Sequence, residues 1–281
     1  MVTRRRCLVP RVPCRIITAC LLSLTLFVGL LPQYRASGEA WQPGTAPAAL
    51  SQSAEEANPR PRVVAILPGH GGKDSGAVHY NAAGKVDLVE RDINLAIARK
   101  LAARLKAAGY VPVLTREGDD SLTPNPGDAM REVQANLDVA NSSNADILVA
   151  IHNNGFSDPS FSGTTTYYCP NREFASENLR LARALQKHMV SGFRDVMGYE
   201  TRDYGVQSAN YKPYGCLYTL GDDRGGTFRA SKMPGALVEA LFVTNDFEAW
   251  VLAQDGGQEL IAAAILDGIQ EYFDSAPISA R

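Results

Sequence analysis

The sequence predicts an α/β fold, a single domain with a mostly parallel, twisted sheet flanked by helices. From residue 61 onward, short apolar runs typical of buried strands alternate with amphipathic helical patterns, and this alternation favours parallel β–α–β units. Most of the connections are short. Three of the apolar runs also end in a histidine or a carboxylate. Parallel strands bring such ends to one edge of a sheet, which is where ligands bind in this fold class.

Five strands are expected where aliphatic and β-branched residues run together between turn residues. In chain order they cover residues 63–67, 110–116, 146–152, 163–168 and 234–243. Pro112 favours an edge position or a strand start for the second run, because proline cannot donate to the hydrogen-bond ladder of a central strand.

Five helices are expected between and after these strands. The first starts at Glu90 and carries apolar residues at every fourth position up to Leu105, with Gly109 just beyond its end. The others are expected at residues 128–142, 177–190, 246–252 and 258–272. Residues 71–89 and 191–233 show no sustained period and are expected to be loops, the second long enough to shape a binding cleft.

The N-terminal segment has the pattern of an export signal. Within residues 1–33, several arginines precede an uncharged apolar run, as in a signal peptide. The run is shorter than the ~20 residues that a membrane span needs, so a cleaved signal is favoured over a retained membrane anchor. Residues 34–60 lack apolar periodicity and are interpreted as a disordered spacer. The folded domain is therefore expected at residues 61–274.

Charge and cysteine content narrow the classes of partner and of metal site that the chain can have. The formal net charge of -2 argues against a nucleic-acid partner, for which a clustered basic face is expected. Cys169 and Cys216 are the cysteines of the folded domain. An exported chain can keep disulfides, but the sequence leaves open whether these two pair. Neither has the spacing of a thiolate zinc site.

Three residues have the character and placement of metal ligands. His70 and His152 each follow a strand, and Glu90 lies in the first turn of a helix. A catalytic zinc site needs three nitrogen or oxygen ligands and one open position, and these three side chains can supply them. Plainer interpretations remain open from the residues alone. His70 could belong to a turn, His152 could be a hydrogen-bonded core residue, and Glu90 could be a first-turn acid that complements the helix dipole.

Glu239 is the candidate general base. It stands within the last apolar strand, where an unpaired carboxylate is costly. Either an arginine pairs with it or its raised basicity is used. We hypothesise that it activates the attacking water and later protonates the leaving amine.

Five sequence blocks in order resemble the zinc-dependent N-acetylmuramoyl-L-alanine amidases of the Amidase_3 type. The resemblance covers about residues 63–272, and its blocks are residues 68–77, 90–98, 114–116, 140–141 and 145–146 together with 151–154, and 234–245. It implies cleavage of the amide between the lactyl group of muramic acid and the first L-Ala of the peptidoglycan stem. By this resemblance residues 61–274 form the zinc amidase catalytic domain.

The resemblance also assigns roles to single residues. His70, Glu90 and His152 match the family's zinc ligands, and Glu239 matches its catalytic glutamate. Two positions depart from the family pattern: Leu67 stands where an Asp is usual, and Asn136 stands where an Arg is common. The first departure is expected to alter the orientation of His70, and the second only packing or a surface pair.

A water-exposed groove is implied, because the glycan strand is a long polymer. Candidates for substrate contacts are Asn154, Tyr167, Tyr204, Tyr211, Tyr214 and Arg224. The expected partner is peptidoglycan. The protein is expected to be a monomer that is secreted or periplasmic. It is expected to touch the membrane only through its N-terminal signal or anchor.

Two alternatives to this interpretation belong to different functional classes. One is a zinc peptidase that acts on the stem peptide. The other is a non-catalytic cell-wall-binding module, which would have no physical need for a zinc and base set.

Overall fold

The computed structural model describes residues 60–119, 121–123, 128–210, 215–221 and 228–275. The signal peptide or anchor predicted at residues 1–33, and the predicted spacer up to residue 59, lie outside the described residues. Among the helices that are described, none has both the length and the apolar character to cross a membrane.

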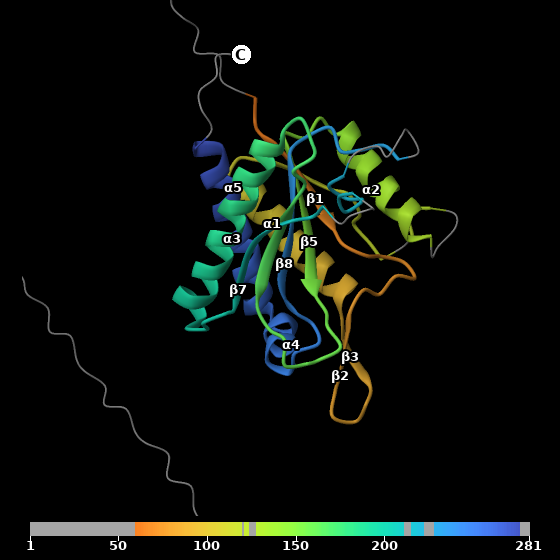
Figure 1. Cartoon of the computed structure of the whole chain (residues 1–281), viewed down its shortest axis with the longest axis vertical. Helices are drawn as coiled ribbons and strands as arrows, with labels where there is room; N and C mark the ends of the chain where they lie inside the picture. Colours follow the sequence, from red (N-terminus) through yellow and green to blue (C-terminus); the bar gives the residue numbers. More distant parts are fainter. Residues whose placement is uncertain (1–59, 120, 124–127, 211–214, 222–227, 276–281) are drawn as a thin grey trace, which may run out of the picture. The chain divides into compact units, whose positions relative to one another are not determined.

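The centre of the fold is a six-stranded sheet in the order β4-β1-β5-β8-β6-β7 (Figure 1). Its strands are β1 (Val63–Pro68), β4 (Val111–Leu114), β5 (Ile147–Asn154), β6 (Thr164–Tyr168), β7 (Asp203–Ser208) and β8 (Gly235–Phe242). All neighbouring pairs are parallel except β6 and β8, which are antiparallel. The predicted fold class is confirmed, and the strand that contains Pro112 is an edge strand, as predicted.

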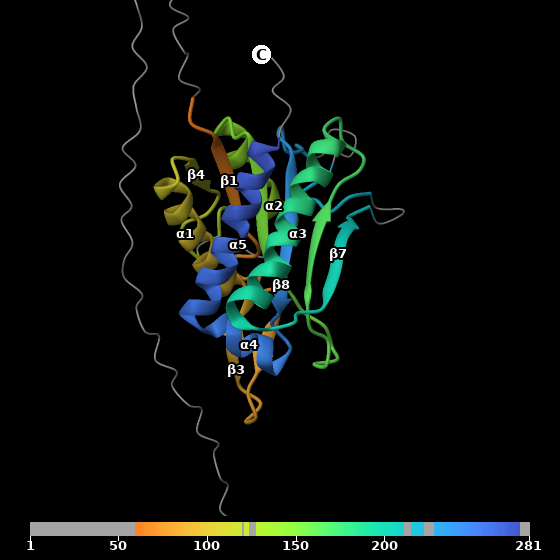
Figure 2. The same ribbon diagram turned by 90° about the vertical axis from the view of Figure 1, so that its left-hand side faces the viewer.

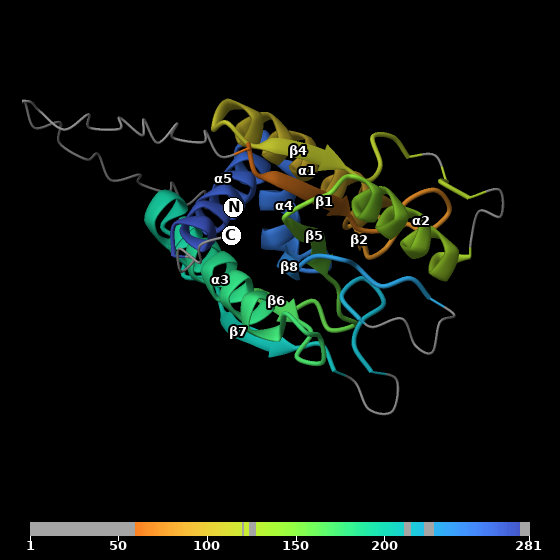
Figure 3. The same cartoon turned by 90° about the horizontal axis from the view of Figure 1, so that it is seen from above.

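Helices cover both faces of this sheet. They are α1 (Glu90–Ala107), α2 (Ala129–Ser142), α3 (Ala175–Met197), α4 (Asp246–Ala253) and α5 (Asp255–Asp274). On one face α1, α3 and α5 form a core that includes Leu101, Leu185 and Ile265, and Figure 2 shows these three helices together. On the other face α2 contributes Leu137 and Ala140 to a second core cluster, and Figure 3 shows α2 across the sheet from α3 and α5.

The two segments expected to be loops contain regular structure. Residues 71–89 include a hairpin of β2 (Val78–Tyr80) and β3 (Val86–Val89). Within 191–233, α3 continues to Met197 and β7 follows it. The helix continues past Gly192, which packs on α5. A Cβ at this position would lie in ordinary contact with Ala264. The expectation that these segments are loops was therefore wrong in part.

Cys169 and Cys216 form a disulfide, which settles the question that the sequence left open. Both half-cystines are buried, in the core cluster on the α2 face. The bond joins the end of β6 to the segment that carries Thr219, and Thr219 lines a cavity together with His70 and His152. The disulfide therefore fixes a distant segment beside the carboxyl ends of β1 and β5.

Replacing both cysteines by serine is expected to lower the free energy of unfolding by about 4 kcal/mol, because the bond spans a sequence separation of 47 residues and restricts the unfolded chain. Denaturant unfolding of the oxidised wild type and the double variant measures the difference. The reduced wild type is the control and should unfold near the midpoint of the variant. An unchanged midpoint after reduction would contradict the expectation.

The carboxyl ends of β1, β5 and β8 lie at one edge of the sheet, since these strands are parallel. His152 on β5 is in register with Glu239 on β8, and Glu239 is in register with Thr165 on β6. Residues in register on adjacent strands point to the same face. Leu148 and Leu237, which precede these residues by an even number of positions, lie in the cluster on the α2 face. The three side chains therefore line up across the α2 face of the sheet.

Candidate metal centre

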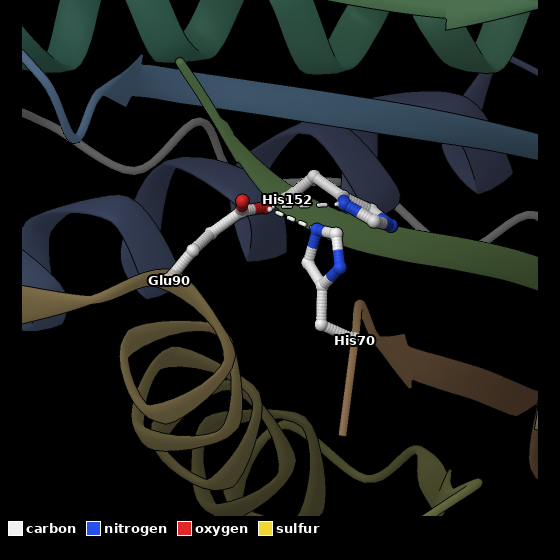
Figure 4. A group of neighbouring side chains, drawn as sticks. All are labelled: His70, Glu90 and His152. Carbon is white, nitrogen blue, oxygen red and sulfur yellow. Dashed lines mark hydrogen bonds and ion pairs between the residues drawn. The ribbon is translucent and has the colours of Figure 1, made fainter. Parts of the chain in front are cut away.

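The structure brings together the three predicted ligand residues. His70 follows β1, Glu90 begins α1 and His152 lies on β5. Their ligand atoms all lie within 4.8 Å of one another, and Figure 4 shows the two imidazoles facing the same carboxylate. Glu90 Oε1 is 3.0 Å from His70 Nε2 and 3.2 Å from His152 Nδ1. Three donors from three separate elements thus converge on one point.

The surroundings of Glu90 keep its side chain ionised. Its side chain is almost fully buried, with Oε2 accepting a hydrogen bond from Ala77 N at 2.8 Å and Oε1 accepting one from Asn153 N at 3.1 Å. Burial alone would raise the pKa of Glu90, but the hydrogen bonds and charges of His152 and His70 outweigh burial and bring the pKa well below its ordinary value. The carboxylate is therefore ready to bind a cation at neutral pH.

His70 is oriented by a carboxylate from its own loop. Its Nδ1 lies 2.9 Å from Asp74 Oδ2, while Asp74 Oδ1 accepts a hydrogen bond from Gly76 N at 3.0 Å. A carboxylate on one imidazole nitrogen fixes the ring so that the other nitrogen can ligate. His70 also has a φ of 63°, a left-handed conformation that is strained for a residue with a side chain. The backbone is bent here to aim this ring.

Asp74 also supplies an orienting carboxylate for His70, although Leu67 stands where the family usually has an Asp. Leu67 is buried in the core cluster on the α2 face, so it offers no polar contact to His70. The carboxylate that contacts His70 comes from the loop instead, four residues after the histidine. The departure at Leu67 therefore does not leave the ring without an orienting group.

The glycines packed against the three donors leave no room there for a further side chain. A Cβ on Gly69 would lie 2.2 Å from the ring of His152, and a Cβ on Gly76 would lie 2.4 Å from Glu90 Oε2 and 2.5 Å from the ring of His70. Two imidazole nitrogens and one carboxylate oxygen are the donors that catalytic zinc takes, with a fourth position left open. The residues present therefore fit a zinc ion.

Glu239 lies beside this cluster, and no lysine or arginine among the described residues forms an ion pair with it. The sequence allowed either an arginine partner or a free, basic carboxylate. Its Oε2 atom is buried and has no hydrogen-bond partner among the described residues. Burial raises the pKa of Glu239 well above its ordinary value, the negative charge of Glu90 raises it further, and His70 offsets part of the effect. The structure favours the second of the two alternatives.

Arg116 is a structural residue of the site to which sequence reasoning gave no role. It is almost fully buried and donates to the backbone oxygens of Pro68, Gly69 and Arg91 at 3.1, 3.0 and 2.9 Å. It thus ties the turn that carries His70 to the first turn of α1. An arginine directly after a strand was the available signal, since such a residue is rarely buried unless it is paired.

Asn136 is more than the packing or surface position that was expected. It is almost fully buried, accepts a hydrogen bond from Thr115 Oγ1 at 2.5 Å and donates to Glu132 O at 2.8 Å. It also lines the cavity that contains His70 and His152. The interpretation as a surface pair is therefore wrong, because α2 packs this side chain beside the metal centre.

The predicted substrate contacts divide into two groups. Asn154 lies two residues beyond His152 and lines an aromatic cavity together with Tyr167 and Tyr204. Three further candidates lie outside the described residues, namely Tyr211, Tyr214 and Arg224.

Zinc uptake by the metal-free protein is expected to release a proton from His70. Burial lowers the pKa of His70, but hydrogen bonds and charges from Glu90 and Asp74 outweigh burial and raise it to about 9, and a metal ligand must be deprotonated. The apparent zinc affinity should therefore rise by about tenfold per pH unit up to about pH 9. Competition with a coloured chelator measures it.

The raised pKa of His70 also makes the stability of the metal-free protein depend on pH. A histidine whose pKa is raised by folding stabilises the metal-free protein fully below its ordinary value of 6.5, and this contribution is lost as the pH rises through about 9. Asp74→Asn is the control for both effects, because removing the Asp74 charge lowers the pKa of His70, so the rise of zinc affinity with pH should level off at a lower pH. An affinity independent of pH would contradict the assignment of His70 as a ligand.

Taken together, the fold and the donor set define a class: an α/β protein with two histidines and a carboxylate that could hold a metal ion at the carboxyl ends of its strands. The sequence matches the Amidase_3 family model, described as N-acetylmuramoyl-L-alanine amidase, over residues 64–271. The chain belongs to this family. It is thus a peptidoglycan amidase, as the resemblance implied.

Relatives named as amidases match most of the chain. The N-acetylmuramoyl-L-alanine amidase LytC of Bacillus subtilis is 32% identical over 208 residues, which are 74% of this chain and 35% of LytC. The germination-specific N-acetylmuramoyl-L-alanine amidase of Bacillus subtilis is 26% identical over 258 residues, which are 90% of this chain and 92% of that protein.

Solved structures agree with the fold. The CwlD amidase from Clostridioides difficile, in complex with the GerS lipoprotein, has a TM-score of 0.61 at 28% identity, covering 76% of this chain and 100% of that chain. AmiC2 of Nostoc punctiforme, an N-acetylmuramoyl-L-alanine amidase, has a TM-score of 0.58 at 29% identity, covering 76% of this chain and 97% of that chain.

Proposed function

We propose that this chain hydrolyses the amide bond between the lactyl group of N-acetylmuramic acid and the first L-Ala of the stem peptide, with a zinc ion held by His70, Glu90 and His152. One observation carries the proposal. The three ligand atoms lie within 4.8 Å of one another, beside a carboxylate, Glu239, whose buried Oε2 has no partner among the described residues.

The chemistry follows from the charges at the site. When bound, zinc supplies the positive charge that polarises a carbonyl and lowers the pKa of water. Glu90 keeps a negative charge in a buried position because His70, His152 and backbone N–H groups surround it. Asp74 holds the ring of His70 in one orientation. Each ligand is thus fixed before the ion binds.

Glu239 carries the proton in this proposal. A general base must lie within reach of the attacking water and have a pKa near the working pH. Burial and the charge of Glu90 raise the pKa of Glu239 from its ordinary value toward that range, and its register with His152 on the neighbouring strand places it beside the ligands. It takes a proton from the water and passes it to the nitrogen of L-Ala, so that this amine leaves neutral.

The setting of the reaction is part of the proposal. Peptidoglycan lies outside the cytoplasm, and the signal predicted at residues 1–33 would export the chain to it. We infer that the secreted or periplasmic protein acts as a monomer and touches the membrane only through that segment.

Digestion of purified peptidoglycan tests the function directly. The protein should release free stem peptides that begin with L-Ala, as identified by mass analysis. A chelator should abolish the release, and added zinc should restore it. Fragments cut within the stem would indicate a peptidase instead, and binding without products would indicate a wall-binding module. Either result would overturn the proposal.

A further inference from the structure

An aromatic cavity of about 330 Å³ lies over the end of β5 and the strands β6 and β7. Its walls carry the aromatic side chains of Phe156, Phe161, Tyr167, Tyr204 and Phe242. The remaining described residues that line it are uncharged as well. A pocket with apolar walls and a few polar groups is the usual form of a small-ligand site.

The aromatic cavity lies next to the candidate metal centre. Thr165, which lines it, is in register with Glu239, and Glu239 is in register with His152. Neighbouring strands are about 5 Å apart, so Thr165 lies about 10 Å from His152 across the sheet. A ligand group one or two sugar rings from the reacting amide would reach this cavity.

Two polar atoms in the walls lack partners. Asn154 Nδ2 and the hydroxyl oxygen of Tyr204 are buried and form no hydrogen bond among the described residues. A buried donor without a partner is destabilising, and most native donors avoid this state. The pair therefore indicates a ligand that brings hydrogen-bonding oxygens into an otherwise apolar space.

The aromatic cavity is held open by packing and hydrogen bonds. Its rings contact one another in series, with centroid distances of 4.4 Å for Phe156 and Phe161, 6.3 Å for Phe161 and Phe242, and 6.2 Å for Phe242 and Tyr204. Beneath them the buried carboxylate of Glu248 accepts hydrogen bonds from Phe242 N at 2.7 Å and Gly163 N at 2.8 Å. The walls are therefore preorganised.

We propose that the aromatic cavity binds a neutral N-acetylated sugar of the glycan strand, an inference that rests on the proposed function. A sugar ring offers a C–H face to aromatic rings, and its hydroxyl and acetamido oxygens suit Asn154 and Tyr204. The stem peptide is the other arm of the substrate, and it ends in a carboxylate. The described residues that line the cavity include no cation. Arg202 lies over the ring of Tyr204, 4.8 Å from its centroid, but does not line the cavity, so the charge of the walls favours the sugar.

Direct binding of N-acetylchitotriose to the zinc-loaded full chain, measured by calorimetry, tests the inference. Phe156→Ala removes one wall, and Tyr204→Phe removes the unpaired hydroxyl alone. Each should weaken binding by about fivefold, the effect of losing one aromatic or hydrogen-bond contact. Phe247→Ala is the matched control: Phe247 is 47% exposed and Phe156 is 50% exposed, and Phe247 contacts the rings of Tyr199 and Trp250 without lining the cavity. This control should bind like the wild type.

The outcomes separate the inference from the proposed function. Stem release without chitotriose binding, or equal binding by the wild type and both cavity variants, would overturn the sugar site and leave the amidase in place. Chitotriose binding that weakens in both cavity variants supports the site even if no stem is released, and the amidase proposal would then fail alone. Binding of the free tripeptide L-Ala-γ-D-Glu-L-Lys that weakens in the cavity variants would make this a peptide site and overturn the inference.

Discussion

Replacing Glu239 by glutamine is expected to lower kcat/KM on peptidoglycan by about a thousandfold while bound zinc is retained. Glutamine keeps the shape of the side chain but cannot take a proton from water. Glu239 is not one of the three clustered ligand residues, so metal content should be unchanged. Stem-peptide release and zinc content, measured on the same preparation, check the two halves of this expectation.

The same substitution has an expected effect on stability. A carboxyl whose pKa is raised by folding contributes its stability at low pH and loses it as the pH rises above the ordinary value of 4.5. At neutral pH Glu239 therefore opposes folding, because it must either keep a buried charge or take up a proton. Metal-free Glu239→Gln should melt at a higher temperature than the metal-free wild type. The gain should shrink as the pH falls toward 4.5.

Glu259→Gln serves as the control for both measurements. Glu259 forms partly exposed ion pairs with Lys100 and Arg104, which lie about 15 and 21 Å beyond Glu90 along α1, so its loss should change neither turnover nor zinc content. Full activity in Glu239→Gln would show that another group accepts the proton, and a loss of zinc in that variant would show that Glu239 supports the metal site instead.

Gly76→Ala is expected to lower zinc affinity by about a hundredfold, although it changes no ligand. The new Cβ would lie 2.4 Å from Glu90 Oε2 and 2.5 Å from the ring of His70. Both side chains must move to admit it, and the three donors can then no longer meet. A chelator competition assay measures the affinity, and residual amidase activity should fall in parallel with zinc occupancy.

Gly84→Ala separates the contact from the backbone strain. Gly84 has a φ of 69° and Gly76 a φ of 63°, so an alanine is strained by a similar amount at each position. Nothing lies within 4 Å of a Cβ on Gly84. This variant should lose some stability and keep the zinc affinity of the wild type. Equal loss of affinity in both variants would mean that strain, and not crowding at the donors, controls the site.

The parts of the site that could be predicted from the sequence are those fixed by strand ends. His70, His152 and Glu239 each follow or lie within an apolar run, and the parallel arrangement of β1, β5 and β8 brings such positions to one edge. Glu90 could be placed in the same way, because it lies in the first turn of a helix. The order of the elements made these four residues candidates, and the resemblance to the family then assigned their roles.

The parts that could not be predicted depend on loop geometry and tertiary contacts. Asp74 reaches His70 only because the backbone of His70 adopts a positive φ, which no periodicity reveals. The hairpin β2–β3 was missed because its short strands are partly or fully exposed and so lack an apolar alternation. The strand β7 owes its pairing to β6, a contact with no local signal.

Because the chain direction reverses between β8 and β6, the loops before β6 and β7 can change during evolution without a change in the central strands. Because β6 and β7 run against the other strands, the loops that lead into them, residues 155–163 and 198–202, arrive at the reactive edge from the margin of the sheet. Insertions there would reshape one wall of the groove without shifting the central strands that hold the donors. Substrate choice can therefore diverge between relatives while the hydrolytic machinery stays the same.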